Sequence, residues 1–243
     1  MEKLIYIVGM GPGDERFMSM QARKAVEDSD IIVAYTLYAK LMKKIYPQKS
    51  YMTTGMKAEI DRCRLCIELA ESNKKVALIC SGDPSVYGMA SLVYELVEKD
   101  SGIELVVVPG ITAACSGAAV LGAPLNHDFC VISLSDLLTP YELIVKRLKA
   151  AIEGDFVIVL YNPSSKSRAD YLMRACEVML EAGADKGRAC GYVENIGREG
   201  TKAFVGTLEE LRTKSVNMFT TVFIGNSESY IKNGKLITKR GYK

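Results

Sequence analysis

The sequence predicts two consecutive α/β domains, and three observations support this prediction. In the N-terminal half, short apolar runs rich in β-branched residues alternate with helical patterns, which is typical of a parallel sheet covered on both faces. After residue 128 several apolar runs follow one another over short connections, as in a mixed sheet. Pro109 and Gly110 interrupt the chain directly after a strand pattern, so we place the domains at residues 1–110 and 111–243.

The same patterns place each element. In the N-terminal domain we expect strands at residues 4–8, 31–35, 75–80 and 103–108, and helices near 18–28, 36–45, 57–73 and 87–99. In the C-terminal domain we expect strands at residues 129–134, 155–161, 188–193, 202–206 and 219–225, and helices near 140–152, 165–182 and 207–213.

The composition is that of a globular protein, with 49% hydrophobic and 25% charged residues. A net charge of +2 gives no reason to expect a nucleic acid or an anionic membrane as partner. We find no signal peptide pattern and no apolar run near the roughly 20 residues that span a bilayer. Seven scattered cysteines indicate reduced thiols and a cytoplasmic location. Cys63 and Cys66 have CxxC spacing but lie in a helical pattern without a second pair, which favours packing and predicts no metal site.

The first expected strand runs into a glycine turn, GMGPGD at residues 9–14. A dinucleotide site requires GxGxxG, and here Asp14 stands where the third glycine belongs. The second strand ends at Tyr35, so no carboxylate follows it to bind a ribose. Pro12 also removes a backbone N–H that an anion would use. The turn therefore allows close approach but does not suit phosphate, and the alternative is a tight turn capped by Asp14.

Two further turns follow later strands, SGDPSVYG at residues 81–88 and VVPGITAACSGAA at 107–119. Turns at the carboxyl ends of parallel strands meet at one edge of the sheet, where α/β proteins bind ligands. Two of the three turns carry an aspartate and none has a P-loop lysine. This pattern favours a ligand with positive charge and an apolar, hydrogen-bonding body over a nucleotide polyphosphate.

The three turns resemble the three motifs of the tetrapyrrole methylases. The second half is similar to the branch of that family that methylates C17 of precorrin-3B, or of cobalt-factor III, in cobalamin synthesis; the similar segments are residues 121–151, 156–168, 225–227 and 240–242. The resemblance implies S-adenosylmethionine as cofactor, held in the cleft between two α/β domains, and a positively charged sulfonium agrees with acidic turns. It also implies a tetrapyrrole substrate, with or without cobalt, and a homodimer.

The resemblance further implies which residues bind the cofactor. They come from the three turns and from loops of the second domain: Pro12, Ser81, Gly82, Asp83, Val86, Thr112, Ala113, Tyr161, Asn162, Asn195 and Ile196.

Methyl transfer needs alignment, whereas the ring contraction that accompanies it needs proton transfers. The candidate catalytic residues are His127, Asp14 and Ser133. We place His127, the sole histidine, at the mouth of the expected cleft; the alternative is a locally hydrogen-bonded loop histidine. For Ser133, together with Ser135 and Asp136, the alternative is a helix N-cap cluster.

The candidate substrate-binding residues match a flat macrocycle with many carboxylates. They are Tyr35, Lys166, Arg168 and Arg198, with packing and solvated surface charge as the alternatives. Other functions remain open: methylation of another macrocycle carbon, of RNA or of protein, or ligand binding without catalysis. The near-neutral charge disfavours RNA, and Asp14 and Tyr35 disfavour a nicotinamide oxidoreductase.

Overall fold

The computed structural model describes residues 2–242, which form two compact units, Met1–Ala113 and Ala114–Lys243. We predicted a boundary at 110/111. The division lies three residues later, at the start of helix α5 (Ala113–Leu121). Pro109 and Gly110 therefore mark the end of the last strand of unit 1 and not the boundary itself.

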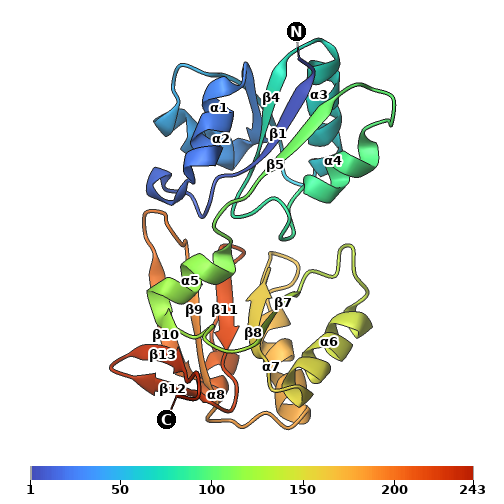
Figure 1. Ribbon diagram of the computed structural model, residues 1–243. Helices are drawn as coiled ribbons and strands as arrows, with labels where there is room; N and C mark the ends of the chain where they lie inside the picture. The colour runs from blue at the N-terminus through green and yellow to red at the C-terminus, as the bar shows by residue number, and fades with distance from the viewer. Residues whose placement is uncertain (1, 243) are drawn as a thin grey trace. The chain divides into compact units, whose positions relative to one another are not determined.

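Unit 1 is a five-stranded sheet of order β3-β2-β4-β1-β5 in which every neighbouring pair is parallel (Figure 1). Its strands are β1 (Leu4–Gly9), β2 (Ile31–Tyr35), β3 (Ser50–Thr54), β4 (Lys75–Cys80) and β5 (Glu104–Val108). Its helices are η1 (Glu15–Phe17, a single 3₁₀ turn), α1 (Met20–Asp28), α2 (Thr36–Ile45), α3 (Glu59–Glu71) and α4 (Ala90–Leu96).

Strand periodicity explains why helices cover both faces of this sheet. Successive side chains of a strand point to opposite faces. In β4, Ala77 and Ile79 pack with α1 and α2, whereas Val76 and Leu78 pack with α3 and α4. Both sets are apolar, so the strand reads as a continuous hydrophobic run, as the sequence predicted.

The connections reverse direction between β1 and β4. These strands are neighbours, but the chain leaves β1 toward β2, beyond β4, and leaves β4 toward β5, beyond β1. Such a switch point opens a crevice at the carboxyl ends of the two strands, where doubly wound sheets bind ligands. The turns at residues 9–14 and 81–88 start from those two strand ends.

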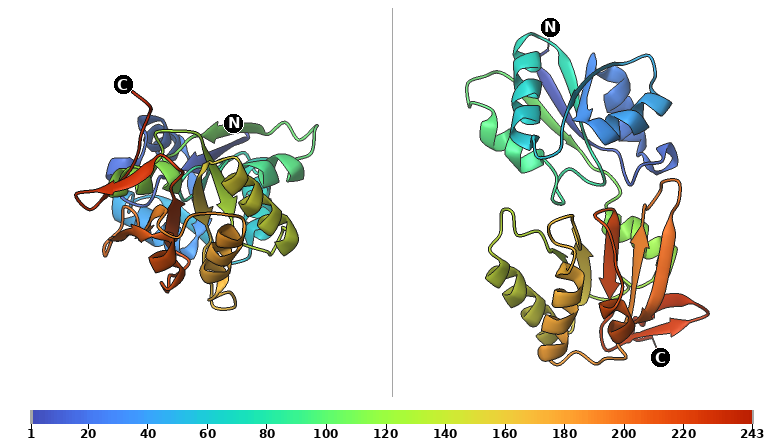
Figure 2. Two further views of the ribbon diagram at one scale, coloured as in Figure 1. Left: turned by 90° about the horizontal axis from the view of Figure 1, so that it is seen from below. Right: turned by 180° about the vertical axis from the view of Figure 1, so that it is seen from behind.

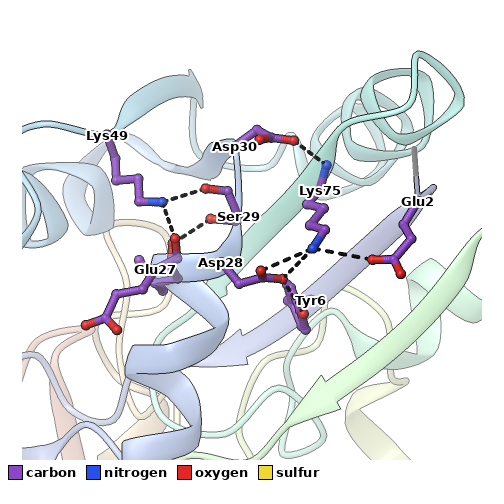
Figure 3. A network of polar contacts seen from close by, with 9 residues as sticks. Glu2, Tyr6, Glu27, Asp28, Ser29, Asp30, Lys49 and Lys75 are labelled. Carbon is purple, nitrogen blue, oxygen red and sulfur yellow. Dashed lines mark hydrogen bonds and ion pairs between the residues drawn. The ribbon is translucent and has the colours of Figure 1, made fainter.

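The opposite, amino edge of this sheet is held by ion pairs (Figure 3). The Lys75 Nζ lies 3.1 Å from both carboxylate oxygens of Asp28 and 3.3 Å from Glu2 Oε2. The Tyr6 hydroxyl donates to Asp28 Oδ2 at 2.7 Å. Burial and this carboxylate raise the pKa of Tyr6 to about 12, while the bonds from Tyr6 and then Lys75 lower the pKa of Asp28.

We expect Asp28→Asn to destabilise the protein at neutral pH by about 1 kcal/mol or less, because the pair is largely exposed. A carboxyl whose pKa is lowered by folding stabilises above its unfolded pKa and stops doing so as the pH falls through its folded pKa. The difference in unfolding free energy between the two proteins should therefore begin to shrink as the pH falls below about 4, the unfolded pKa of an aspartate, and should disappear once the pH is below the lowered folded pKa of Asp28. Urea unfolding at several pH values measures this, and a difference that persists in acid would contradict it.

Unit 2 is built on a mixed sheet of order β10-β9-β11-β8-β7, in which only β7 and β8 pair in parallel. Its strands are β7 (Phe129–Ser133), β8 (Val157–Tyr161), β9 (Ala189–Glu194), β10 (Lys202–Thr207) and β11 (Thr220–Ile224). Helices α6 (Tyr141–Glu153), α7 (Tyr171–Glu181) and α8 (Leu208–Arg212) pack on one face, where the core of this unit lies.

Helix α5 lies on the other face of this sheet (Figure 2). The helix can approach closely because Gly117 faces the ring of Phe223, and a Cβ at Gly117 would come within 2.8 Å of that ring. One turn later Leu121 packs over Gly191 of β9, where an added Cβ would lie 3.2 Å from it. Small residues on the helix and on the strand are thus what bring the two elements together.

A second, three-stranded sheet of order β12-β13-β6 was not predicted. It consists of β6 (Gly122–Ala123), β12 (Ser229–Lys232) and β13 (Lys235–Thr238). The β12–β13 hairpin turns at Asn233 and Gly234, which both have positive φ (51° and 71°), as a type I′ turn requires. Strand β3 was also missed, because its sequence SYMTT carries no apolar alternation.

The CxxC cysteines take the packing role that the sequence favoured. Cys63 and Cys66 lie on α3 and both are fully buried against the sheet of unit 1. Burial raises the pKa of the Cys63 thiol to about 11 and that of Cys66 well above its ordinary value, so both stay protonated at neutral pH.

Candidate functional site

The turns that follow β1 and β4 are joined by their backbones. Gly11 N–H donates to Gly82 O at 3.2 Å, and Gly82 N–H donates to Gly11 O at 2.8 Å. Both residues have φ near +70°, a left-handed conformation that favours glycine. The two turns at the switch point are therefore one hydrogen-bonded unit.

The third turn packs against this pair at Gly110. A Cβ on Gly110 would lie 2.1 Å from Gly82 O and 2.8 Å from Gly9 Cα, and a Cβ on Gly9 would lie 2.6 Å from Gly110 N. These contacts are between backbones, so no side-chain rotation relieves them. We call Gly9, Gly11, Gly82 and Gly110 the glycine cluster; it brings all three predicted turns together within unit 1.

Asp83 holds the second and third turns in place. Its Oδ2 accepts from Gly110 N–H at 3.0 Å and its Oδ1 accepts from Ser85 N–H at 2.8 Å. The carboxylate thus bonds to backbone on both sides. From the sequence we predicted that this aspartate offers negative charge to a cationic ligand. In the structure its carboxylate joins two turns, through residues that are 27 positions apart in the chain.

Asp14 is likewise occupied locally. It caps η1, accepting from Arg16 N–H at 2.9 Å, and it pairs with the Arg16 guanidinium at 2.9 Å. The hydrogen bond from the Arg16 side chain lowers the pKa of Asp14 to about 2. An ionised carboxylate of this kind does not donate a proton near neutral pH, so the geometry favours the capping role over the catalytic one.

The remaining first-unit candidates lie beside the glycine cluster. Pro12 is buried in the first turn, while Ser81 and Val86 are half-buried in the second. A Cβ on Gly82 would meet the backbone of the third turn at Thr112, Ala113 and Ile111, at 3.6 Å, 3.8 Å and 3.9 Å, which is ordinary contact. Together with Gly82 and Asp83, seven predicted cofactor residues thus lie around the switch point of unit 1.

The second-unit candidates gather where β7, β8 and β9 end, because these three strands run in the same direction. Asn162 Nδ2 donates to Ser133 Oγ at 2.9 Å, and Tyr161 Oη accepts from Ala114 N–H at 2.8 Å. Asn162 and Asn195 each follow a strand with φ of +53°, which asparagine tolerates better than most residues. Ile196, by contrast, is 6% exposed and packs toward Gly117 of α5.

His127 lies at the wrong end of β7 for the predicted grouping. It precedes β7, whereas Ser133 is the last residue of that five-residue strand, which is about 16 Å long. The Nδ1 of His127 accepts from Asp128 N–H at 3.0 Å, and the Asp128 carbonyl accepts from Val157 N–H at the amino end of β8. The structure therefore does not bring the candidate catalytic residues His127 and Ser133 together, because they lie at opposite ends of β7.

The predicted N-cap alternative for Ser133, Ser135 and Asp136 is also wrong, because Pro140 caps α6 without a side-chain bond. Asp136 instead accepts from Arg168 Nη1 at 3.1 Å and from the Tyr171 hydroxyl at 2.6 Å, and the latter bond is the main cause of its lowered pKa.

Arg168, a predicted substrate residue, also donates to Ser135 and Ser165, and its side chain is 13% exposed. It ties together the loops after β7 and β8. Lys166 in the same loop is exposed. Arg198 lies over the ring of Phe219, 5.7 Å from its centroid. Tyr35 ends β2 in unit 1, with its ring edge-on to Tyr38 at 5.3 Å.

The motif at 225–227, GNS, has a structural explanation. Asp155 Oδ1 accepts from Ser227 N–H and from Arg188 Nη2, at 3.0 Å and 3.1 Å. These residues lie where β11 ends and where β8 and β9 begin, at the edge opposite Tyr161. The motif therefore closes the far edge of the sheet and does not contribute to the candidate site.

The switch-point turns fit a cationic, hydrogen-bonding cofactor. Residues 9–13, 81–86 and 109–113 contain no lysine, arginine or histidine, so nothing in these turns repels a sulfonium. Within residues 2–242 no cluster of three His, Cys, Asp or Glu side chains is arranged to hold a metal ion. In the same range no helix is both long and apolar enough to cross a bilayer.

A doubly wound sheet with a glycine-lined switch point, followed by a mixed α/β unit, defines a ligand-binding α/β protein. The chain belongs to the family described as Tetrapyrrole (Corrin/Porphyrin) Methylases, which its residues 4–212 match. Members of this family use S-adenosylmethionine as methyl donor.

The chain is similar to named members of the family over nearly its whole length. It is 44% identical to a probable cobalt-factor III C(17)-methyltransferase of Salmonella typhimurium, over 98% of this chain and 99% of that protein. It is 37% identical to a precorrin-3B C(17)-methyltransferase of a Sinorhizobium species, over 93% and 90%. The crystal structure of the methyltransferase CobJ superposes with a TM-score of 0.89 at 33% identity, over 97% of this chain and 99% of that one.

Proposed function

We propose that this protein transfers the methyl group of S-adenosylmethionine to C17 of cobalt-factor III and contracts the macrocycle ring in cobalamin synthesis. The observation that carries the proposal is the glycine cluster, which joins three turns without a basic residue at the switch point of unit 1. The relatives support the position of the methyl group, since two at 44% identity and one at 37% identity are named for C17.

The same relatives support cobalt in the substrate. The two at 44% identity are named for cobalt-factor III, whereas the one named for precorrin-3B is 37% identical. The metal in this proposal belongs to the substrate and not to the protein.

The methyl transfer step depends on the alignment of cofactor and substrate more than on proton transfer. When bound, the cofactor supplies an electrophilic methyl group for an in-line displacement. The contribution of this chain is to hold the cofactor rigidly, since alignment alone can supply several kcal/mol of the barrier reduction. The bridge between Gly11 and Gly82 and the bonds of Asp83 give the turns that rigidity. We assign cofactor binding to the turn residues and to Tyr161, Asn162 and Asn195.

The test is incubation of the purified protein with S-adenosylmethionine and with cobalt-factor III or precorrin-3B, followed by mass spectrometry and NMR of the product. We expect one added methyl group at C17 and a contracted ring with the cobalt substrate. A methyl group at another carbon would assign the chain to a sibling activity of the same family. Binding of the cofactor without turnover of either substrate would contradict the proposal. A homodimer also remains a prediction, which light scattering checks.

His127 provides a further prediction. Because it lies at the amino end of β7, away from Ser133, Tyr161 and Asn162, we expect His127→Ala to form the contracted product at nearly the normal rate. Loss of a general acid or base slows a step by roughly 10²–10⁴-fold. Single-turnover kinetics of the wild type and of His127→Ala measures this. A loss of that size, with accumulation of an uncontracted methylated product, would restore His127 as the proton-transfer residue.

A further inference from the structure

Arg62 is a buried arginine that no carboxylate neutralises. It lies in the first turn and a half of α3 and is 3% exposed. Within residues 2–242 no acidic oxygen lies within 4.0 Å of its guanidinium nitrogens. A buried charge without a partner is costly, and arginine is almost always paired when it is buried.

The hydrogen bonds of Arg62 leave most of its donors unused. Nη2 donates to Gly55 O at 2.8 Å, and Nη1 lies 3.4 Å from the weakly accepting sulfur of Met89. Nε is buried and has no partner. Nε and Nη2 form the side of the guanidinium that binds a carboxylate with two parallel hydrogen bonds.

A second unpartnered donor lies beside it. The Oγ1 of Thr54 is also buried without a hydrogen bond, and Thr54 directly precedes Gly55. Thr54 is the register partner of Tyr35, whose ring centroid is 5.9 Å from Arg62 Cζ. The unused donors therefore lie together where β2 and β3 end, which is the edge of unit 1 that carries the glycine cluster.

The segment that directly follows Thr54 lies at the surface. Gly55, Met56 and Lys57 are exposed, and an added Cβ on Gly55 would meet nothing within 4 Å. A ligand carboxylate is a stronger acceptor than the Gly55 carbonyl and would compete with it for Nη2. Because Gly55 has no side chain, it does not block the acceptor that replaces it.

We infer that Arg62 and Thr54 form a binding site for a carboxylate, and that the carboxylate is one of the acidic side chains of the tetrapyrrole substrate. The second part rests on the proposed function. Arg62 supplies a two-pronged, charged contact and Thr54 adds a hydroxyl, while the ring of Tyr35 lies beside the guanidinium. The site fixes which acidic arm of the macrocycle lies over unit 1, and so contributes to substrate orientation.

The test compares Arg62→Met with Arg64→Met, which removes the same charge from an exposed position on the same helix. We expect Arg62→Met to fold with an unchanged or higher melting temperature, since replacing a buried unpaired charge by an apolar side chain is often neutral or stabilising. It should bind S-adenosylhomocysteine normally in calorimetry. Its affinity for cobalt-factor III should fall by roughly 10–100-fold, the loss typical of a charged hydrogen-bonded pair. Arg64→Met should match the wild type in all three measurements.

Unchanged affinity of Arg62→Met for the macrocycle would overturn the inference. If that variant does not fold, Arg62→Lys and Thr54→Val decide the question, since both should weaken macrocycle binding while cofactor binding stays normal. If the wild type binds no macrocycle, the proposed function fails, and a second arm judges the site alone. Sodium acetate, compared with sodium chloride at equal ionic strength, should raise the melting temperature of the wild type but not of the Arg62 variant. Equal effects in both proteins would remove the site.

Discussion

Replacing Gly110 with alanine should abolish cofactor binding and destabilise unit 1 by about 3 kcal/mol or more. The new Cβ would lie 2.1 Å from Gly82 O and 2.8 Å from Gly9 Cα, so two turns would have to move apart. Overpacking against side chains costs about 1–3 kcal/mol, and here the contacts are with backbone that has no rotamers to change. The movement would also break the bond from Gly110 N–H to Asp83 and shift the backbone around Gly82.

Gly102→Ala is the matched control. Gly102 has φ of +67°, but an added Cβ there would meet nothing within 4 Å, and the residue precedes β5 at the amino edge of the sheet. It carries only the cost of a left-handed alanine, about 1–2 kcal/mol. Urea unfolding and calorimetry with S-adenosylhomocysteine measure both effects. If Gly110→Ala binds the cofactor as Gly102→Ala does, the glycine cluster does not form the cofactor site.

Replacing Phe223 with alanine should destabilise unit 2 by about 3–5 kcal/mol, the usual cost of removing a buried phenylalanine. Phe223 is fully buried on β11, and its ring packs against Gly117 of α5. Because Gly117 has no side chain, nothing at that position of the helix can fill the space that the ring would leave. The amino end of α5 is the segment that bonds to Tyr161 Oη, so the candidate site should lose order as well.

Phe129→Ala serves as the comparison, because Phe129 is 42% exposed at the start of β7 and should cost much less. Hydrogen exchange of α5 amides together with denaturant unfolding separates a local loss from a global one. Equal destabilisation by the two substitutions would show that the packing of Phe223 against α5 is not what holds this helix on the sheet of unit 2.

Much of the fold was readable from local patterns. The apolar runs of β1, β2 and β4 predicted a parallel sheet covered on both faces, because each residue of such a strand is buried on one face or the other. Strand β3 was not readable, since this edge strand has no fully buried side chain and therefore needs no alternation of apolar and polar residues. The hairpin β12–β13 was readable in principle, because Asn-Gly between two short apolar runs is a strong turn signal.

The candidate site was predicted in its chain segments but not in its contacts. The glycines of the three turns were found from sequence because tight turns and close approach require that residue type. The hydrogen-bond partner of Asp83 could not be found from the sequence, because Gly110 lies 27 residues away and only the fold of the sheet brings it near. Arg168 looked like a free cation for the substrate, and its three internal partners follow from how two loops meet after parallel strands.

The sequence by itself determined most of the strands and helices, the three turns and the family motifs, because each depends on residues close together in the chain; strands β3, β6, β12 and β13 are the exceptions. Only the tertiary structure decided which residues from distant parts of the chain meet at each edge of a sheet. His127 and Ser133 are six residues apart, yet β7 holds them at opposite edges of its sheet. It also decided that Arg62 is buried without a counter-charge, since burial depends on what α3 packs against and not on α3 itself.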